Sequence, residues 1–380
     1  MPTTPTLLRR LAVTALLLLP LALTTAPATA ATPTAVQLEL PPPTGPYAVG
    51  RNTVHMVDPS RQDPWVPEAG ARELMVSLYY PAREGTGTPA PYMTTPEADR
   101  LLKTQGYDGV VAPETVSATR TNTRRHARPA PGRHPLLILS PGFTLPRTTL
   151  TVLSEELASR GYLVAAVDHA YESAAATFPG GRLLPCVACE KYKETGMPAV
   201  AEGRARDLSF ATDELTAPTS PYAALIDAGR IGVAGHSVGG ATAVPAMAAD
   251  PRFRAGANLD GGFFVDVPAS GLDGRPFLML GTQTTHSPGN ETWDRTWRNL
   301  TGWKRWLTVT DAGHFTFTDL PVLASQLGIT DPMAPLSGRR SGEITRTYLS
   351  AFFDLHLRHI PQPVLTGPTP ANPEVTFQHA

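Results

Sequence analysis

The stretch RIGVAGHSVGGATA, residues 230–243, carries the clearest structural signal in the chain. The first five residues of this stretch form a β-rich run. Its last residues are small and suit a helix. Between them lies the pentapeptide GHSVG, residues 235–239, a G-x-S-x-G pattern. A serine on a sharp turn between strand and helix exposes its hydroxyl, and flanking glycines let the two elements approach closely. The stretch therefore predicts a strand–turn–helix unit with Ser237 as a nucleophile.

Strands and helices alternate on both sides of this unit. The predicted strands are residues 73–80, 136–139, 162–167, 230–234, 255–259, 276–280 and 306–309, and the predicted helices are residues 148–160, 201–216 and 342–357. Such alternation predicts a mostly parallel central sheet with helices on both faces. Short apolar strands without a polar face fit burial on both sides. With the serine turn, the pattern predicts an α/β-hydrolase fold.

Residues 1–30 have the features of an export signal. Two arginines, Arg9 and Arg10, precede an apolar run over residues 11–23, and the small-residue site ATA ends the segment at Ala30. That order is typical of a cleaved signal peptide, and the run is too short to be a good membrane span. We therefore expect a secreted, extracellular protein without a stable membrane anchor.

The remaining 350 residues, 31–380, fit a single domain. We expect an extended N-terminal segment over residues 31–70 and a Pro-rich tail over residues 361–380. Losing the signal removes two arginines and no carboxylate, so the formal charge goes from −1 to −3. This balance gives no reason to expect nucleic acid as a partner. The chain is expected to be a monomer.

Cys186 and Cys189 are the two cysteines of the chain. Export favours a disulfide between them over free thiols. Zinc would need two further ligands at suitable spacing, which the sequence lacks, so no metal site is expected. Because only two residues separate the cysteines, the stabilisation should be modest.

His314 is the best candidate for the general base that Ser237 needs. It follows the last predicted parallel strand, residues 306–309, in a loop where that strand ends. The weaker rivals are His286 in a polar loop, His356 and His359 on the last helix, and His236, whose side chain we expect to point away from Ser237.

Asp260 is the candidate acid. In this fold the chain order is serine, acid, histidine. Many such enzymes carry the acid after the penultimate strand, but residues 281–284 hold no carboxylate. Asp260 ends the preceding strand at the same sheet edge and can orient His314 and stabilise its imidazolium. Asp273 and Asp311 are the alternatives.

Attack on a carbonyl places negative charge on its oxygen, so two donors must already point there. The backbone N–H of Val238, next to the nucleophile, is one expected donor. The N–H of Phe143, in the loop after the strand of residues 136–139, is the other. Apolar side chains near these loops are candidates for a substrate pocket: Leu145, Phe263, Phe264 and Phe315.

Several stretches of the chain resemble the platelet-activating factor acetylhydrolase family and the bacterial lipases and esterases grouped with it. They are PTGPY (43–47), SPGF (140–143), LASRGY (157–162), VAAVDH (164–169), GHSVGG (235–240) and LDG (259–261). The resemblance covers roughly residues 40–358. It implies calcium-independent hydrolysis of short acyl esters, with the acid on the earlier strand. The animal enzymes have histidine where Pro141 stands here, so their phospholipid specificity need not carry over.

The sequence thus predicts a serine esterase or lipase acting on a small-molecule or lipid ester, with no cofactor. A cutinase-like polyester hydrolase is the alternative, although its acid usually follows the penultimate strand. A hydrolase-fold binding protein without catalysis is the alternative of another class. For the enzyme we expect activity to fall below about pH 6, since the reference pKa of imidazole is roughly 6.5.

Overall fold

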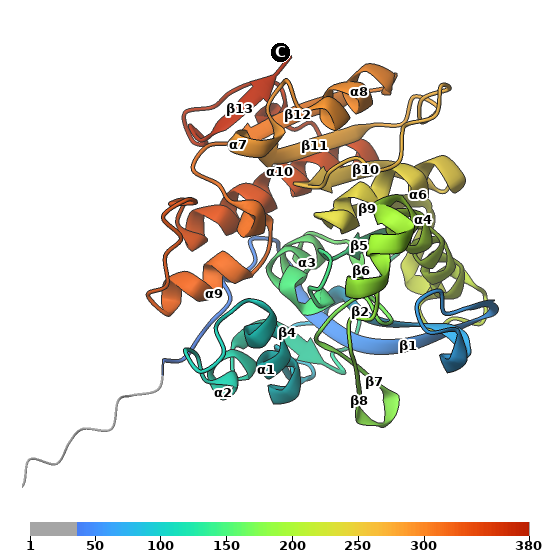
Figure 1. Ribbon diagram of the computed structural model, residues 1–380, viewed down its shortest axis with the longest axis vertical. Coiled ribbons are helices and arrows are strands. Elements are labelled where there is room, and N and C mark those ends of the chain that lie inside the picture. The colour runs from blue at the N-terminus through green and yellow to red at the C-terminus, as the bar shows by residue number, and fades with distance from the viewer. Residues whose placement is uncertain (1–35, 380) are drawn as a thin grey trace, which may run out of the picture. The chain divides into compact units, whose positions relative to one another are not determined.

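A mixed sheet of eleven strands forms the frame of the protein in the computed structural model, which describes residues 36–379 (Figure 1). The strand order is β13-β12-β11-β10-β9-β5-β6-β2-β1-β4-β3. The strands are β1 (Ala48–Gln62), β2 (Ala71–Ala82), β3 (Thr88–Pro91), β4 (Arg120–Arg125), β5 (His134–Ser140), β6 (Leu163–His169), β9 (Ile226–His236), β10 (Phe253–Leu259), β11 (Phe277–Thr282), β12 (Lys304–Val309) and β13 (Val375–Gln378). A separate hairpin pairs β7 (Ala176–Phe178) with β8 (Arg182–Leu184).

The centre of the sheet is parallel. Strands β6, β5, β9, β10, β11 and β12 pair in parallel, whereas β2 and β13 add antiparallel strands on either side. This confirms the mostly parallel sheet predicted from the sequence. All carboxyl ends of the parallel strands lie on one edge, where ligands bind in sheets of this kind.

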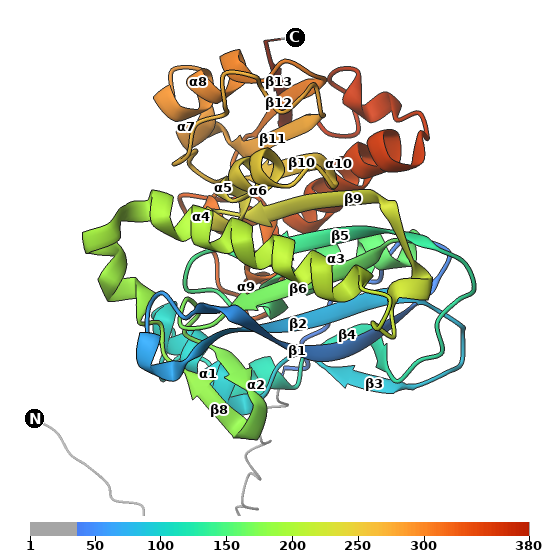
Figure 2. The ribbon, with the colours of Figure 1, turned by 90° about the vertical axis from the view of Figure 1, so that its right-hand side faces the viewer.

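Helices cover both faces of the sheet (Figure 2). They are α1 (Thr95–Thr104), α2 (Pro113–Ser117), α3 (Thr151–Ser159), α4 (Ala188–Thr216), α5 (Val238–Ala241), α6 (Ala243–Ala249), α7 (Gln283–His286), α8 (Glu291–Asn299), α9 (Leu320–Gln326) and α10 (Gly338–Arg358). In β5, Leu136 and Ile138 join the core beneath α4 and α6, while Leu137 and Leu139 join the core beneath α3 and α10. Burial on both faces is why the central strands show no polar alternation.

Two terminal segments contribute more to the sheet than the sequence indicated. Within the segment 31–70, residues 48–62 form β1, a long strand paired with β2 along most of its length. The Pro-rich tail ends in β13, where the alternate side chains of Val375 and Phe377 pack into the core. A four-residue strand after many prolines is a weak local pattern, and its pairing with β12 stabilises it.

The predicted export signal, residues 1–30, lies outside the described residues. Among residues 36–379, no helix has the length and apolar character that crossing a bilayer requires.

Candidate active site

Ser237 occupies the turn between β9 and α5. Its backbone has φ 55° and ψ −125°, a left-handed conformation that non-glycine residues rarely adopt. The Ser237 N–H donates to Leu259 O at 2.8 Å, which ties the turn to the end of β10. A side chain at Gly239 would lie 2.1 Å from Ser140 O, so only glycine fits there. The strained turn leaves the Ser237 side chain partly exposed at the sheet edge.

Ser237, His314 and Asp260 form a continuous chain of hydrogen bonds. The distance from Ser237 Oγ to His314 Nε2 is 2.9 Å, and that from His314 Nδ1 to Asp260 Oδ2 is 2.7 Å. His314 begins a short helical turn after β12, and its side chain is 48% exposed. The structure thus brings together the three side chains singled out in the sequence, in the geometry that lets an imidazole remove the serine proton.

Asp260 is buried directly after β10. Burial alone would raise the pKa of its carboxyl, but hydrogen bonds from His286 and His314 outweigh burial and lower the pKa to about 2. The Thr282 N–H, at the end of β11, also donates to Asp260 Oδ1 at 2.7 Å. Asp260 is therefore ionised throughout the neutral range and accepts hydrogen bonds through both oxygens.

His286, a weaker candidate for the base in the sequence, is a second histidine in contact with the Asp260 carboxylate. It ends α7, next to β11, and its Nδ1 lies 2.7 Å from Asp260 Oδ1. A polar loop between two predicted strands gives no local sign of this contact. The one feature of the sequence that indicates this contact is the position of His286 after the penultimate parallel strand, at the sheet edge where Asp260 also lies.

His236 holds the backbone of the loop that carries His314. Its ring is fully buried, and its Nε2–H donates to the backbone oxygen of His314 at 2.6 Å. Burial, followed by the nearby His314 ring, lowers the pKa of His236 to about 4. His236 is therefore neutral at pH 7 and holds the main chain of His314.

The loop after β5 carries the second expected oxyanion donor. Within residues 36–379, the N–H groups of Phe143 and Val238 have no protein acceptor, so both remain free for a ligand. The loop is held by Arg204 of α4, whose guanidinium donates to Pro141 O at 2.6 Å and to Ser140 Oγ at 3.2 Å. This contact fixes the backbone immediately before Phe143.

Arg204 belongs to a buried ionic network. It donates to Glu172 at 2.7 Å, and Glu172 also accepts from Arg72 at 2.8 Å. Arg72 in turn binds Asp207 at 2.7 Å. Hydrogen bonds and opposite charges offset the cost of burying these groups. The network links the loop after β5 (residues 141–146), the candidate oxyanion loop, to β2 and α4.

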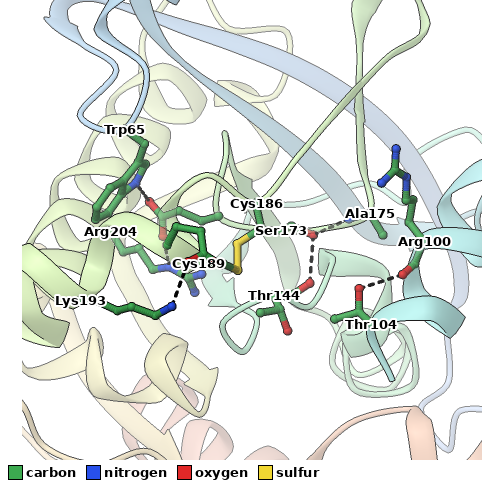
Figure 3. Close-up of a disulfide and its surroundings, with 12 residues drawn as sticks. Trp65, Arg100, Thr104, Thr144, Ser173, Ala175, Cys186, Cys189, Lys193 and Arg204 are labelled. Atoms are coloured by element: carbon green, nitrogen blue, oxygen red, sulfur yellow. Dashed lines mark hydrogen bonds and ion pairs between the residues drawn. A yellow bond between two sulfur atoms is a disulfide. The ribbon is translucent and has the colours of Figure 1, made fainter. Parts of the chain in front are cut away.

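The start of α4 packs beside the oxyanion loop. Cys186 and Cys189 are disulfide-bonded, which confirms the predicted pairing, and Figure 3 shows the bond near Trp65 and Arg204. The ring of Tyr192 meets that of Phe143 edge-on at a centroid distance of 5.5 Å. Helix α4 begins 13 residues earlier than predicted and is broken at Gly196, where φ is 80°.

The four candidate pocket residues divide into two pairs. Leu145 and Phe263 are each 1% exposed and belong to the hydrophobic core, so they do not line a surface pocket. Phe264 and Phe315 are 37% and 39% exposed. Phe315, with His314, lines a cavity of about 540 Å³ between α1 and α9 whose walls are mostly aliphatic. Leu145 and Phe263 therefore support the loops from the core side, and the pocket prediction rests on Phe264 and Phe315.

Among the described residues, no group of three or more histidine, cysteine, aspartate or glutamate side chains is arranged to hold a metal ion.

The chain is similar to proteins that are named as esterases. A solved structure described as a ferulic acid esterase from Streptomyces cinnamoneus superposes with a TM-score of 0.81 and 46% identity, covering 90% of this chain and 99% of that one. A probable 1-alkyl-2-acetylglycerophosphocholine esterase of Arthroderma benhamiae is 27% identical over 369 residues, covering 89% of this chain and 93% of the relative. Fold and relatives together define the class: this is a carboxylic ester hydrolase of the α/β-hydrolase fold.

A family model narrows the identification. The model described as platelet-activating factor acetylhydrolase, isoform II, matches residues 33–180 and 222–331. The chain belongs to this family. The platelet-activating factor acetylhydrolase of Cavia porcellus is 30% identical over 159 residues, which cover 34% of this chain and 35% of that protein. The residues between the matched segments, 181–221, contain the disulfide and all of α4.

Proposed function

We propose that this chain is an exported serine esterase that acts through Ser237, His314 and Asp260 and a covalent acyl-enzyme. The observation that carries the proposal is the unbroken hydrogen-bond chain from Ser237 Oγ to the buried Asp260 carboxylate. The strained turn at Ser237 and the free N–H groups of Phe143 and Val238 support it. The proposal of export rests on the signal-like pattern of residues 1–30. The disulfide is consistent with export, because disulfides persist in oxidising, extracellular surroundings.

Acylation begins when His314 Nε2 takes the proton of Ser237 Oγ as the serine attacks the ester carbonyl. The carbonyl oxygen becomes an oxyanion, which the N–H groups of Phe143 and Val238 stabilise. Asp260 keeps the His314 Nδ1–H oriented and stabilises the imidazolium. His314 then gives its proton to the departing alcohol oxygen, and the acyl group remains on Ser237.

Deacylation repeats these steps with water. His314 removes a proton from the water molecule that attacks the acyl-enzyme, and the same two donors hold the second oxyanion. When this second tetrahedral intermediate collapses, the carboxylic acid leaves and His314 returns the proton to Ser237 Oγ.

The proposed substrates are short acyl esters, including phospholipids that resemble platelet-activating factor. Family membership and the fungal relative named for such an ester support this choice. Apolar contacts for such a substrate near Ser237 would come from the side chains of Phe143, Tyr192 and Phe315. A cutinase-like activity fits less well, since the end of β11 carries no acid.

A specific observation favours a second candidate substrate. The solved structure with 46% identity over nearly the whole chain is described as a ferulic acid esterase. Aromatic rings prefer edge-on and offset contacts with other rings. The Phe143–Tyr192 pair beside the oxyanion loop offers such contacts to an aromatic acyl group, so hydroxycinnamate esters are the alternative to short aliphatic ones.

The test is hydrolysis of p-nitrophenyl esters from acetate to palmitate, with methyl ferulate in the same panel, by the mature protein and its Ser237→Ala variant. We expect rates to be highest for short acyl chains and to be abolished by the substitution. Preference for methyl ferulate would replace the short-acyl assignment by the aromatic one. Equal hydrolysis by wild type and variant would reject the proposed nucleophile.

A further inference from the structure

Asp260 has two histidine partners, and the proposed reaction uses only one of them. His314 Nδ1 lies 2.7 Å from Asp260 Oδ2, and His286 Nδ1 lies 2.7 Å from Asp260 Oδ1. Each carboxylate oxygen thus faces one imidazole nitrogen at the distance of a strong, charge-assisted hydrogen bond. The two imidazoles come from different elements, His314 from the loop after β12 and His286 from α7.

The tautomer of His286 follows from its hydrogen-bond partners. Because Asp260 is ionised, it can only accept, so the His286 Nδ1 must carry a hydrogen and donate it. Thr285 Oγ1 lies 3.0 Å from the same nitrogen and serves as a second, longer acceptor. The contact with Asp260 therefore calls for the tautomer in which this nitrogen is protonated, and the Thr285 hydroxyl can accept from the same hydrogen.

Aromatic packing holds His286 in this orientation. Its ring lies against Trp293, with centroids 4.4 Å apart and planes 31° from parallel, and its backbone oxygen accepts from Trp306 Nε1 at 2.7 Å. A side chain at Gly281 would come within 2.8 Å of the His286 Cβ, so the glycine makes room for the ring. Trp293 Nε1 also donates to Gly261 O, next to Asp260. One tryptophan thus braces both the histidine and the loop of its acceptor.

We propose that His286 is a positioning residue that fixes the Asp260 carboxylate toward His314. This rests on the proposed catalytic role of Ser237, His314 and Asp260. Asp260 Oδ1 accepts from two donors, His286 and the Thr282 N–H, and without His286 it keeps the backbone donor alone. The plane of the carboxylate is then held less firmly. Many enzymes of this fold carry their acid after the strand that corresponds to β11. Here the end of β11 and the following α7 instead supply two donors to Asp260, which follows β10: the Thr282 N–H and His286.

A matched pair of variants separates hydrogen bonding from packing. His286→Asn places an amide nitrogen near the position of Nδ1 but removes the ring, whereas His286→Phe keeps a ring against Trp293 and removes the donor. We expect His286→Phe to lower kcat on the order of tenfold with little change in KM, the size of one hydrogen bond to a charged group. His286→Asn should recover most of that loss. Recovery by phenylalanine instead of asparagine would reject the proposal and assign His286 to packing.

Proton NMR supplies a readout that a packing role would not move. Wild type should give two strongly deshielded Nδ1–H resonances, one from each histidine on Asp260, and Asp260→Asn should remove both. His286→Phe should remove one and broaden or shift the other, because the Asp260 carboxylate is held less firmly with the Thr282 N–H as its remaining donor at Oδ1. An unchanged second resonance together with an unchanged kcat would overturn the proposal. Failure of Ser237 to react with a fluorophosphonate in wild type would instead overturn the underlying triad.

Discussion

At the level of single residues, the proposed reaction depends on one proton path, from Ser237 Oγ to His314 Nε2. The serine hydroxyl lies 2.9 Å from an imidazole whose other nitrogen is held by a buried, ionised carboxylate. Among the described histidines, His314 is the one that is hydrogen-bonded to Ser237 Oγ, so it is the base at hand. The members of such a triad act as a unit, and losing one removes most of the benefit of the others.

Substitution of the acid should show how much the orientation of His314 matters. Asp260→Asn keeps the shape of the side chain but cannot hold the required tautomer, so we expect kcat to fall by about 10⁴. Steady-state kinetics with p-nitrophenyl acetate would measure this, and Asp311→Asn, a change at an exposed loop position, is the matched control. A loss of kcat of tenfold or less for Asp260→Asn would show that another residue is the acid of the triad.

The pH profile should separate the imidazole from the carboxylate. The pKa of Asp260 is lowered to about 2, so this carboxyl stays ionised well below pH 6. Loss of activity below about pH 6 would therefore report protonation of an imidazole, whose reference pKa is roughly 6.5. The profile of kcat/KM between pH 4 and 8 is the measurement, and constant activity down to pH 4 would contradict a histidine base.

At the scale of elements, α4 connects the core to the oxyanion loop through Arg204. Arg204→Met removes the donor to Pro141 O and leaves the buried Glu172 with one fewer cation. We expect the free energy of unfolding to drop by about 3–5 kcal/mol and kcat to fall more than KM rises. Urea unfolding and kinetics measure the two effects. If stability falls but kcat per folded molecule is unchanged, the network supports the fold without positioning the loop.

The disulfide should have a local effect. Cys186 and Cys189 enclose a very small ring, so replacing both by serine should cost only about 2 kcal/mol of stability. Because Tyr192, three residues beyond, packs on Phe143, we expect KM to rise severalfold. A double-serine variant compared with wild type under non-reducing conditions tests this, and an unchanged KM would separate the disulfide from substrate binding.

How far the sequence predicts these elements depends on how local each signal is. The turn at Ser237 and the position of His314 after β12 are set by neighbours in the chain, so both are visible in the sequence. The strand β13 and the contact of His286 with Asp260 depend on partners 70 and 26 residues away, and no local pattern reveals them. The same limit explains Phe263, whose burial depends on Trp293 rather than on the loop that carries it.

At the scale of the whole molecule, several histidines are buried in neutral form. Burial lowers the pKa values of His134, His169, His236 and His356, with His236 and His356 at about 4. The unfolded chain binds protons at these sites near pH 6.5, before the folded chain does. Stability is therefore fully present above about pH 6.5 and is lost as the pH falls toward 4.

Thermal unfolding measured across this window should show that loss. His236 alone accounts for about 3 kcal/mol when the pH reaches its folded pKa region, at about 1.4 kcal/mol per pKa unit. His236→Gln keeps a donor near the position of Nε2 and removes the titration, so its melting temperature should vary less between pH 6.5 and 4. An identical pH dependence in wild type and variant would contradict the contribution assigned to His236.

Ser237 can be tested as the nucleophile by mapping the site that a fluorophosphonate modifies, by mass spectrometry of the mature protein. We predict one adduct, on Ser237, with no adduct in Ser237→Ala and much slower labelling in His314→Ala, because the serine needs its base. A fluorophosphonate adduct at another residue, or equal labelling of the Ser237→Ala variant, would contradict the assignment of Ser237 as the nucleophile.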